Sequence, residues 1–402
     1  MIDESVFKLK IMLPIVCWLS AIFVTAASPD TLSLIFVGDL MQHQAQINAA
    51  RKGNGAFSYK GCFDFVAPEL RKADLAVGNL EVTLGGKPYR GYPVFSAPDE
   101  YLHAIRNAGF DVLLFANNHC LDRGNRGAVR TLGQLDSMRI LHTGVFRNAK
   151  ERMENYPLLV ERKGFRIVFL NYTYDTNGLR PTPPLLVNYI DRNQIRKDIM
   201  KARMMRPDAI IACMHWGVEY ELLPRNGEKQ LTKFLLDLGV DHVIGGHPHV
   251  AQPLEVIADS VSPVRHLIAY SLGNFISNMS ARHTDGGMMV KMVLKKVAGH
   301  TRMVDCGYSY VWTSRPELNR KGQFFIYPAG ILERKSYSDI EIREQLKKTC
   351  QINNELLMLM ENRAENEGNC LNNNEEERMK RFLDSIRKVI GPHTKGIKEY
   401  FF

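Results

Sequence analysis

The stretch Leu34-Ile35-Phe36-Val37-Gly38-Asp39 runs from four apolar residues into a glycine and a carboxylate. A short, continuous apolar run of this kind is typical of a strand buried on both faces, as in the parallel sheet of an α/β protein. The same order, an apolar run followed by a polar motif, recurs downstream. It is found at 111–115, 209–212 and 242–244.

The motifs that close these runs contain Asp, Glu, Asn and His. In chain order they are Gly38-Asp39, Asn79-Leu80-Glu81, Asn117-Asn118-His119 with Asp122, His215-Trp216-Gly217, Gly246-His247-Pro248-His249 and Gly273-Asn274-Phe275. Ligand sites of open α/β sheets lie at the carboxyl ends of the strands, so these side chains are expected to converge on one crevice. A mixed oxygen and nitrogen donor set suits Mn, Zn, Fe or Co better than calcium or a thiolate-bound zinc.

Each motif also has an ordinary structural explanation. Asp39 serves equally well as a helix N-cap, and a lone Glu81 is more commonly an exposed loop carboxylate. A single strand-end histidine such as His215 is more often a satisfied core residue. The strongest pair is His247 and His249, because the proline between them presents two imidazoles with little entropy to lose.

Asn118 and His119 have a sharper functional interpretation than a turn or a cap. The Asn118 oxygen can ligate a metal, and the His119 imidazole can act as an acid. Asp122 lies three residues on and could orient that imidazole if the segment is helical.

Strands and helices alternate from Leu32 to about residue 245, which predicts a sheet that is largely parallel at its core. The expected strands are 32–38, 74–80, 111–116, 208–214 and 240–245, and the expected helices are a stretch from about Gln42 and 63–72, 99–107, 126–138, 192–205 and 227–238. Two runs at 158–162 and 166–172 predict a hairpin. After Gln252 the chain becomes strand-rich, with expected strands at 265–271, 288–296, 302–313 and 323–327.

The two ends of the chain differ from this middle part. Lys8 and Lys10, the apolar stretch 11–25 and the small residues at 26–28 have the layout of a secretory signal, so residues 1–27 are predicted to be a signal peptide or an N-terminal anchor. The stretch 336–402 shows no strand pattern and is rich in Glu, Lys, Asn and Arg. Amphipathic helices are expected at 340–361 and 375–389. We therefore expect one main domain over 28–335 and a helical appendage over 336–402.

The composition is that of an ordinary globular protein of 402 residues with a formal net charge of +9. An excess of positive charge favours binding to anionic partners. No run of basic residues with interleaved aromatics is visible, so nucleic acid is not an expected partner. The cysteines are scattered without metal spacing, and Cys120 and Cys213 are expected to be buried apolar residues.

Taken together, these motifs resemble the CapA-type capsule-synthesis family, associated with poly-γ-glutamate capsules, which in turn is similar to the calcineurin-like metallophosphoesterases. The matching stretch runs from about Leu32 to Ile276. The resemblance implies a four-layer α/β/β/α sandwich with two metals at the sheet edge. It implies that Asp39 and His249 hold one divalent metal, that Asn118, His215 and His247 hold the other, and that Glu81 bridges them.

The same resemblance implies that His119 acts on the leaving group or transition state and that Asp122 holds it. Two positions depart from the phosphoesterase pattern: Met41 stands where a histidine is expected, and Glu81 replaces an aspartate. Three functions follow as hypotheses. The first is an extracytoplasmic, metal-dependent hydrolase or transferase acting on poly-γ-glutamate or a related anionic polymer. The second is a non-catalytic partner of a membrane synthase or exporter that binds the polymer, and the third is a regulatory surface protein that uses the C-terminal helices for assembly.

Overall fold

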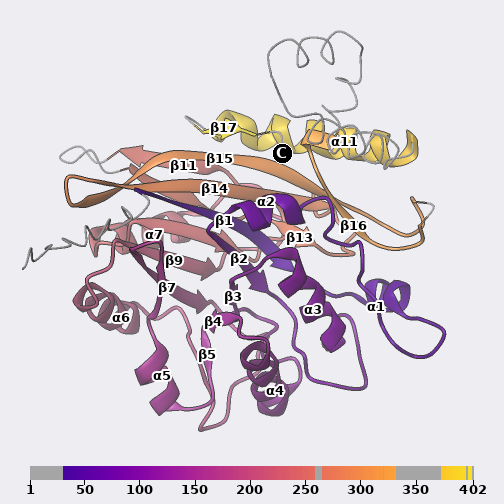
Figure 1. The fold of residues 1–402 in the computed structure, drawn as a ribbon, viewed down its shortest axis with the longest axis horizontal. Coiled ribbons are helices and arrows are strands. Elements are labelled where there is room, and N and C mark those ends of the chain that lie inside the picture. Colours follow the sequence, from indigo (N-terminus) through magenta and orange to yellow (C-terminus); the bar gives the residue numbers. More distant parts are fainter. Residues whose placement is uncertain (1–29, 259–264, 320, 332–372, 395–396, 401–402) are drawn as a thin grey trace, which may run out of the picture.

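The computed structural model describes residues 30–258, 265–319, 321–331, 373–394 and 397–400. Figure 1 shows two sheets stacked on each other, with helices on the outside and a long C-terminal helix across the top of the view. The predicted signal or anchor at 1–27 and the expected helix at 340–361 lie outside the described residues.

The larger sheet has nine strands around a parallel centre. Its main path is β16-β15-β14-β1-β2-β3-β4; β13 also pairs with β1, and β17 with β15. Strands β1 to β4 are parallel to one another, whereas β14, β15 and β16 are antiparallel. The bounds are β1 (Thr31–Leu40), β2 (Leu75–Leu80), β3 (Val112–Leu114), β4 (Leu141–Thr143), β13 (Asn274–Ile276), β14 (Gly286–Val297), β15 (His300–Ser314), β16 (Phe325–Pro328) and β17 (Lys398–Glu399).

The smaller sheet has six strands in the order β11-β12-β10-β9-β7-β6. Its four central strands are parallel, and the two edge strands are antiparallel. The bounds are β6 (Leu158–Arg162), β7 (Phe165–Thr173), β9 (Ala209–His215), β10 (His242–Gly246), β11 (Leu254–Ala258) and β12 (Arg265–Ala269). A separate pair joins β5 (Val145–Phe146) to β8 (Leu186–Val187).

Alternating side chains show how the two sheets stack. In β1, Leu34 and Phe36 belong to the central apolar core, whereas Ile35 and Val37 belong to a second core. In β9, Ile211 joins that same central core, while its neighbours Ile210 and Ala212 join a third. Because successive side chains of a strand point to opposite faces, the central core lies between the two sheets.

Helices cover the two outer faces. The second core takes in α2 (Ala67–Lys72), α3 (Asp99–Ala108) and α4 (Gly124–Ser137), which pack on the larger sheet. The third core takes in α6 (Arg192–Met204) and α7 (Asn226–Asp237), which pack on the smaller sheet. The fold is therefore the expected four-layer α/β/β/α sandwich. The short helices α1 (Gln44–Ala50) and α5 (Ala149–Asn155) lie in connections.

Two expectations about element bounds are wrong. The helix expected over 63–72 begins only at Ala67, because Pro68 lacks an N–H and is tolerated in the first turn of a helix. The stretch 336–402 was expected to hold no strand, yet β17 pairs with β15 in parallel.

The long C-terminal helix α11 (Asn373–Ile390) packs against the larger sheet. Met379, Phe382 and Ile386 of this helix are buried in the central core with Tyr310 and Trp312 of β15. A 3₁₀ turn (Gly391–His393) follows the helix. The division into a main domain over 28–335 and an appendage over 336–402 stays a prediction. No helix among the described residues is long and apolar enough to cross a membrane.

Candidate metal centre

The predicted site residues lie where the carboxyl ends of both sheets meet. Asp39 ends β1, Glu81 directly follows β2, and Asn118 with His119 occupies the turn after β3. From the smaller sheet, His215 ends β9, and His247 and His249 follow β10. All seven side chains are at most 3 % exposed, and Asp122 is 8 % exposed.

Five of the six predicted ligands form two groups that share Glu81. The first contains Glu81, His247 and His249, and the second contains Asp39, Glu81 and His215. Within each group the donor atoms lie within 4.8 Å of one another. Glu81 is the one residue common to both groups, and its predicted role as a bridging ligand stays a prediction.

The sixth predicted ligand, Asn118, lies beside the second group, because its Oδ1 is 2.8 Å from Nε2 of His215. This grouping differs from the pairing that the resemblance implies, in which Asp39 and His249 share one metal. Those two side chains are nevertheless in contact: Nδ1 of His249 is 3.1 Å from Oδ2 of Asp39.

Glu81 has the environment of a carboxylate without its counter-ion. Its Oε1 is buried and has no hydrogen-bond partner among the described residues. That same atom is 3.7 Å from Nε2 of His215 and 3.7 Å from Nε2 of His249. Burial raises the pKa of Glu81 well above its usual value, and the charge of Asp39 adds to the increase. A cation bound between Glu81 and these imidazoles would stabilise the charged form of the carboxylate and so lower this pKa.

Two of the predicted ligand histidines, His215 and His247, are held neutral, which is the form that ligates metals. Burial lowers the pKa of His247 to about 3, with His249 contributing. The pKa of His215 is lowered well below its usual value, again mainly by burial. Nδ1 of His247 is buried without a hydrogen-bond partner among the described residues. The chain therefore offers neutral nitrogens and an unpaired carboxylate oxygen, a donor set that fits Mn, Zn or Fe.

Asp39 behaves differently from Glu81. Burial raises its pKa, but the hydrogen bond and charge of His249, together with hydrogen bonds from Asn79 and Glu81, outweigh burial, and the net pKa is lowered. The backbone next to it is tightly constrained: a Cβ on Gly38 would lie 1.8 Å from the carbonyl oxygen of Gly273. Only glycine permits this close approach of β1 to the segment before β13. Asn274 in turn holds His249, since its Oδ1 is 3.1 Å from Nδ1 of that ring.

Asn79 was quoted in a motif but not assigned a role, and it lies at the centre of the site. The backbone N–H of His119 donates to Oδ1 of Asn117, whose Nδ2 donates to Oδ1 of Asn79. A backbone N–H can only donate, so it fixes the polarity of both amides. Nδ2 of Asn79 must therefore donate to Asp39 Oδ1 at 2.8 Å and to Glu81 Oε2 at 3.0 Å.

His119 and Asp122 form the pair expected from the sequence. Nδ1 of His119 is 2.8 Å from Oδ2 of Asp122, and that oxygen also accepts the backbone N–H of Phe95. The Phe95 ring packs edge-on against the imidazole, with ring centroids 4.6 Å apart. Burial raises the pKa of Asp122 despite its bond to His119. The imidazole is thus oriented through Nδ1, which leaves Nε2 available to a substrate.

The backbone after β10 is strained where it presents the two histidines. His247 has a φ of 100° and His249 a φ of 59°, both in the left-handed region that non-glycine residues rarely adopt. Strain of this kind is tolerated where surrounding structure over-determines it, and it clusters at functional sites. Gly245 within β10 permits a close approach of this strand to the chain at Tyr270, because a Cβ there would lie 1.9 Å from the Tyr270 carbonyl oxygen.

Two exposed tyrosines lie next to histidines of the buried cluster. Tyr174, which directly follows β7, packs against His247 with the rings tilted and their centroids 4.4 Å apart, and it is 43 % exposed. Tyr92 lies with its ring centroid 6.5 Å from that of His119 and is exposed. Neither residue was predicted, since a lone tyrosine in a loop gives no sequence signal.

Two residues that follow Asp39 closely in the sequence, Met41 and His43, do not join the cluster. Met41 is buried in the apolar core beneath α2 to α4, so it offers no ligand. His43 accepts the backbone N–H of Asn278 at 3.2 Å, and burial lowers its pKa to about 4. Cys120 and Cys213 are free and buried, as expected.

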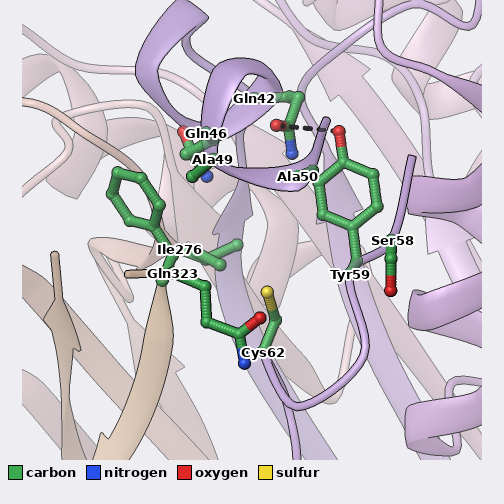
Figure 2. Close-up of a pocket in the computed structure, with 10 residues that line it drawn as sticks. Gln42, Gln46, Ala49, Ala50, Ser58, Tyr59, Cys62, Ile276 and Gln323 are labelled. Atoms are coloured by element: carbon green, nitrogen blue, oxygen red, sulfur yellow. Dashed lines mark hydrogen bonds between the residues drawn. The ribbon is translucent and has the colours of Figure 1, made fainter. Parts of the chain in front are cut away.

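A small cavity beneath α1 is not a substrate site. Figure 2 shows Gln42, Tyr59 and Cys62 facing this space, with the Tyr59 hydroxyl bonded to the Gln42 side chain. Its volume is only about 10 Å³, the space of about one water molecule.

Comparison with known proteins adds a family to this geometry. Residues 33–279 match the family described as bacterial capsule synthesis protein PGA_cap. The chain is 28 % identical over 290 residues to the PGA biosynthesis protein CapA of Bacillus subtilis, covering 67 % of this chain and 69 % of that protein. It is 28 % identical over 285 residues to the capsule biosynthesis protein CapA of Bacillus anthracis, covering 66 % of this chain and 64 % of that one.

Solved structures with a similar arrangement are more distant in sequence. The NAD nucleotidase NadN of Haemophilus influenzae gives a TM-score of 0.43 at 13 % identity, covering 89 % of this chain and 60 % of that one. The calcineurin-like phosphoesterase YfkN of Bacillus subtilis gives a TM-score of 0.41 at 13 % identity, covering 70 % of this chain and 90 % of that one.

Proposed function

The chain belongs to the bacterial capsule synthesis protein family, and from this premise we propose that it is a metal-dependent hydrolase or transferase acting on an anionic envelope polymer such as poly-γ-glutamate. The observation that carries the proposal is the unpaired, buried Oε1 of Glu81, placed 3.7 Å from imidazole nitrogens of His215 and His249. A purely structural core has no use for such an arrangement, because an unpaired buried carboxylate is costly.

In this proposal the metal is held by the mixed donor set at the sheet ends. The ligands would be Asp39, Glu81, Asn118, His215, His247 and His249. A bound divalent ion would polarise a carbonyl or phosphoryl oxygen and lower the pKa of a bound water.

The remaining chemistry falls to His119. Asp122 fixes the imidazole through Nδ1 at 2.8 Å, so the other nitrogen can pass a proton to a leaving group. Burial of both partners keeps water from competing for that hydrogen bond. Tyr174 and Tyr92 would contact the substrate at the mouth of the site.

We further propose an extracytoplasmic location at the cell envelope, with residues 1–27 as a signal peptide or anchor and a membrane synthase or exporter as partner. The support is the order of basic, apolar and small residues at that end. The names of the two CapA relatives, which refer to PGA and capsule biosynthesis, support the choice of polymer.

A second function, a non-catalytic polymer-binding or export partner, is favoured by one observation. The amide of Asn79 already donates to both Asp39 and Glu81. These hydrogen bonds partly stabilise the two carboxylates in the absence of a metal ion. Such a site could persist as a recognition pocket.

The experiment measures substrate turnover by the purified full chain after its metal has been removed and replaced, in separate samples, with Mn, Zn or Fe. Phosphoester and γ-glutamyl substrates are assayed side by side, with His119→Ala as the control that keeps every proposed ligand. We expect wild-type turnover of one substrate class to exceed the control by about 10²–10⁴-fold. Metal-loaded wild type that turns over nothing, while still binding poly-γ-glutamate, would instead support the non-catalytic function.

A further inference from the structure

A second concave site lies between the C-terminal helix and the rim of the larger sheet. It is a cavity of about 400 Å³ bounded by the segment 280–285, the end of β15 and the middle of α11. That volume is within the range of small-molecule pockets. Four arginines line it, namely Arg282, Arg315, Arg378 and Arg381.

The charge balance of this arginine cavity is strongly positive. Among the described residues that line it, Asp285 is the only acidic one, and it already bonds Arg315 at 2.8 Å. Arg381 makes only an exposed, 3.6 Å contact with Glu377. Neither Arg282 nor Arg378 forms an ion pair with any residue in the part of the chain that the structure describes. The cavity therefore has guanidinium groups to spare for an anionic ligand.

The base of the cavity is apolar. Trp312, Leu318 and Phe382 line it together with the arginines, and Trp312 and Phe382 belong to the central core. Guanidinium groups form forked hydrogen bonds with carboxylates, and an apolar base suits methylene groups between them. The combination matches a chain that carries carboxylates on short hydrocarbon spacers.

A solvated basic surface is the ordinary explanation for clustered arginines, and two features argue against it here. First, the lining comes from segments about a hundred residues apart that the central core locks together. Second, His283 in the lining is only 8 % exposed and has a φ of 68°. Arg282, Arg378 and Arg381 are themselves exposed. A basic patch that only meets solvent nevertheless needs no strained and largely buried residue such as His283 among them.

The segment that borders this cavity also contacts the candidate metal centre. Asn274, whose Oδ1 lies 3.1 Å from His249, donates from Nδ2 to the carbonyl oxygen of Thr284 at 3.0 Å. Arg315 donates to the carbonyl oxygen of Met279 on the other side of the same segment. One chain segment therefore separates the two sites, so a polymer could engage both.

We propose that the arginine cavity binds carboxylate groups of an anionic polymer and so holds the chain while the metal centre acts on it. The identity of the polymer rests on the proposed function, whereas the cavity and its charge do not. Such a second site would favour long substrates over short ones, because each extra contact is made by an already tethered chain.

The experiment measures binding of short γ-linked glutamate oligomers to the full chain by calorimetry and by tryptophan fluorescence. Arg378→Gln and Arg381→Gln should each weaken binding by roughly five- to tenfold. The matched control, Lys388→Gln, removes one positive charge from the same helix outside the cavity, and it should leave binding unchanged. Trp312→Phe should remove the fluorescence change while leaving the calorimetric affinity nearly intact.

His247→Ala separates this proposal from the proposed function. It should lose metal while keeping oligomer affinity within about twofold. Wild type that binds while both arginine variants keep full affinity would overturn the arginine cavity and leave the metal chemistry untouched. No binding to wild type, or tighter binding of inorganic phosphate than of the oligomer, would overturn the carboxylate assignment even if turnover is observed.

Discussion

The two sheets of the sandwich contribute different chemistry to the same site. The ends of the larger sheet supply oxygen atoms, from Asp39, Glu81 and Asn118. The ends of the smaller sheet supply imidazole nitrogens, from His215 and from the two histidines after β10. A buried, unpaired carboxylate destabilises the folded state because burial disfavours its charged form. An imidazole can be buried in its neutral form at a lower cost in free energy.

Neither sheet alone supplies a complete set of candidate ligands. Each of the two ligand groups combines at least one carboxylate from the larger sheet with at least one imidazole from the smaller. A metal that binds both would stabilise the stacked state, because ligands that bind only the folded form add to its stability. The candidate centre is thus coupled to the packing of the central core.

His119 is the exception to this division, since it is an imidazole carried by the larger sheet. Its contact with Asp122 at 2.8 Å suggests a role in proton transfer. Replacing it, His119→Ala, should leave metal content unchanged and lower turnover by about 10²–10⁴-fold. Metal analysis and steady-state kinetics on the same sample measure both. Loss of metal in this variant would show that His119 belongs to the ligand set after all.

Replacing Glu81 is the most direct test of a metal site shared by the two sheets, because both ligand groups include this residue. Glu81→Gln keeps the shape and removes the charge, and it should weaken metal binding by more than about a hundredfold at both positions. His215→Ala should affect mainly the group with Asp39, and His247→Ala mainly the group with His249. Titration calorimetry with Mn²⁺ follows each case. Equal, complete losses in all three variants would mean that a single ion is bound.

The sequence predicted the strand ends and therefore every ligand candidate. An apolar run followed by Gly-Asp or His-Pro-His carries its own local signal, as at Asp39 and His247. The strands at the core of both sheets were predicted for the same reason. The three-residue strand β4 and the two-residue strand β5 were missed, because neither segment shows a clear apolar run or periodicity.

What the sequence could not reveal is contact between distant segments. Asn79 received no role from the sequence, because its contacts depend on Asn117 and on the backbone N–H of His119, thirty-eight and forty residues away. Tyr174 joins the site only because β7 lies beside β9 in the smaller sheet. The arginine cavity combines residues near 282, 315 and 378, which no local pattern connects.

Asn79 provides a sharper test of the oxygen-rich side. Asn79→Asp replaces an amide that donates to Asp39 and Glu81 with a third carboxylate about 3 Å from them. Without metal, like charges repel, so the thermal midpoint of the stripped protein should fall. With metal, the added charge should raise affinity by roughly ten- to a hundredfold. A variant that changes neither quantity would contradict the hydrogen-bond polarity described for this amide.

The smaller sheet should also make the fold sensitive to acid, and His242 at the start of β10 tests this away from the metal centre. Burial lowers its pKa to about 3, and its Nδ1 accepts the backbone N–H of Leu267 at 3.1 Å. The unfolded chain takes up a proton near pH 6.5, whereas the folded chain resists protonation down to about pH 3. The stability contribution is therefore fully present above pH 6.5 and is lost as the pH falls toward 3.

His242→Asn removes the titrating group and keeps an oxygen in place to accept from Leu267. Between pH 6.5 and 3 it should reduce the slope of unfolding free energy against pH by at most about 1.4 kcal/mol per pH unit. Denaturant unfolding of metal-stripped protein at several pH values measures the slope, and above pH 6.5 the slopes of variant and wild type should coincide. An unchanged slope in acid would mean that His242 is already protonated in the fold, and the acid sensitivity would then have to come from the carboxylates of the larger sheet.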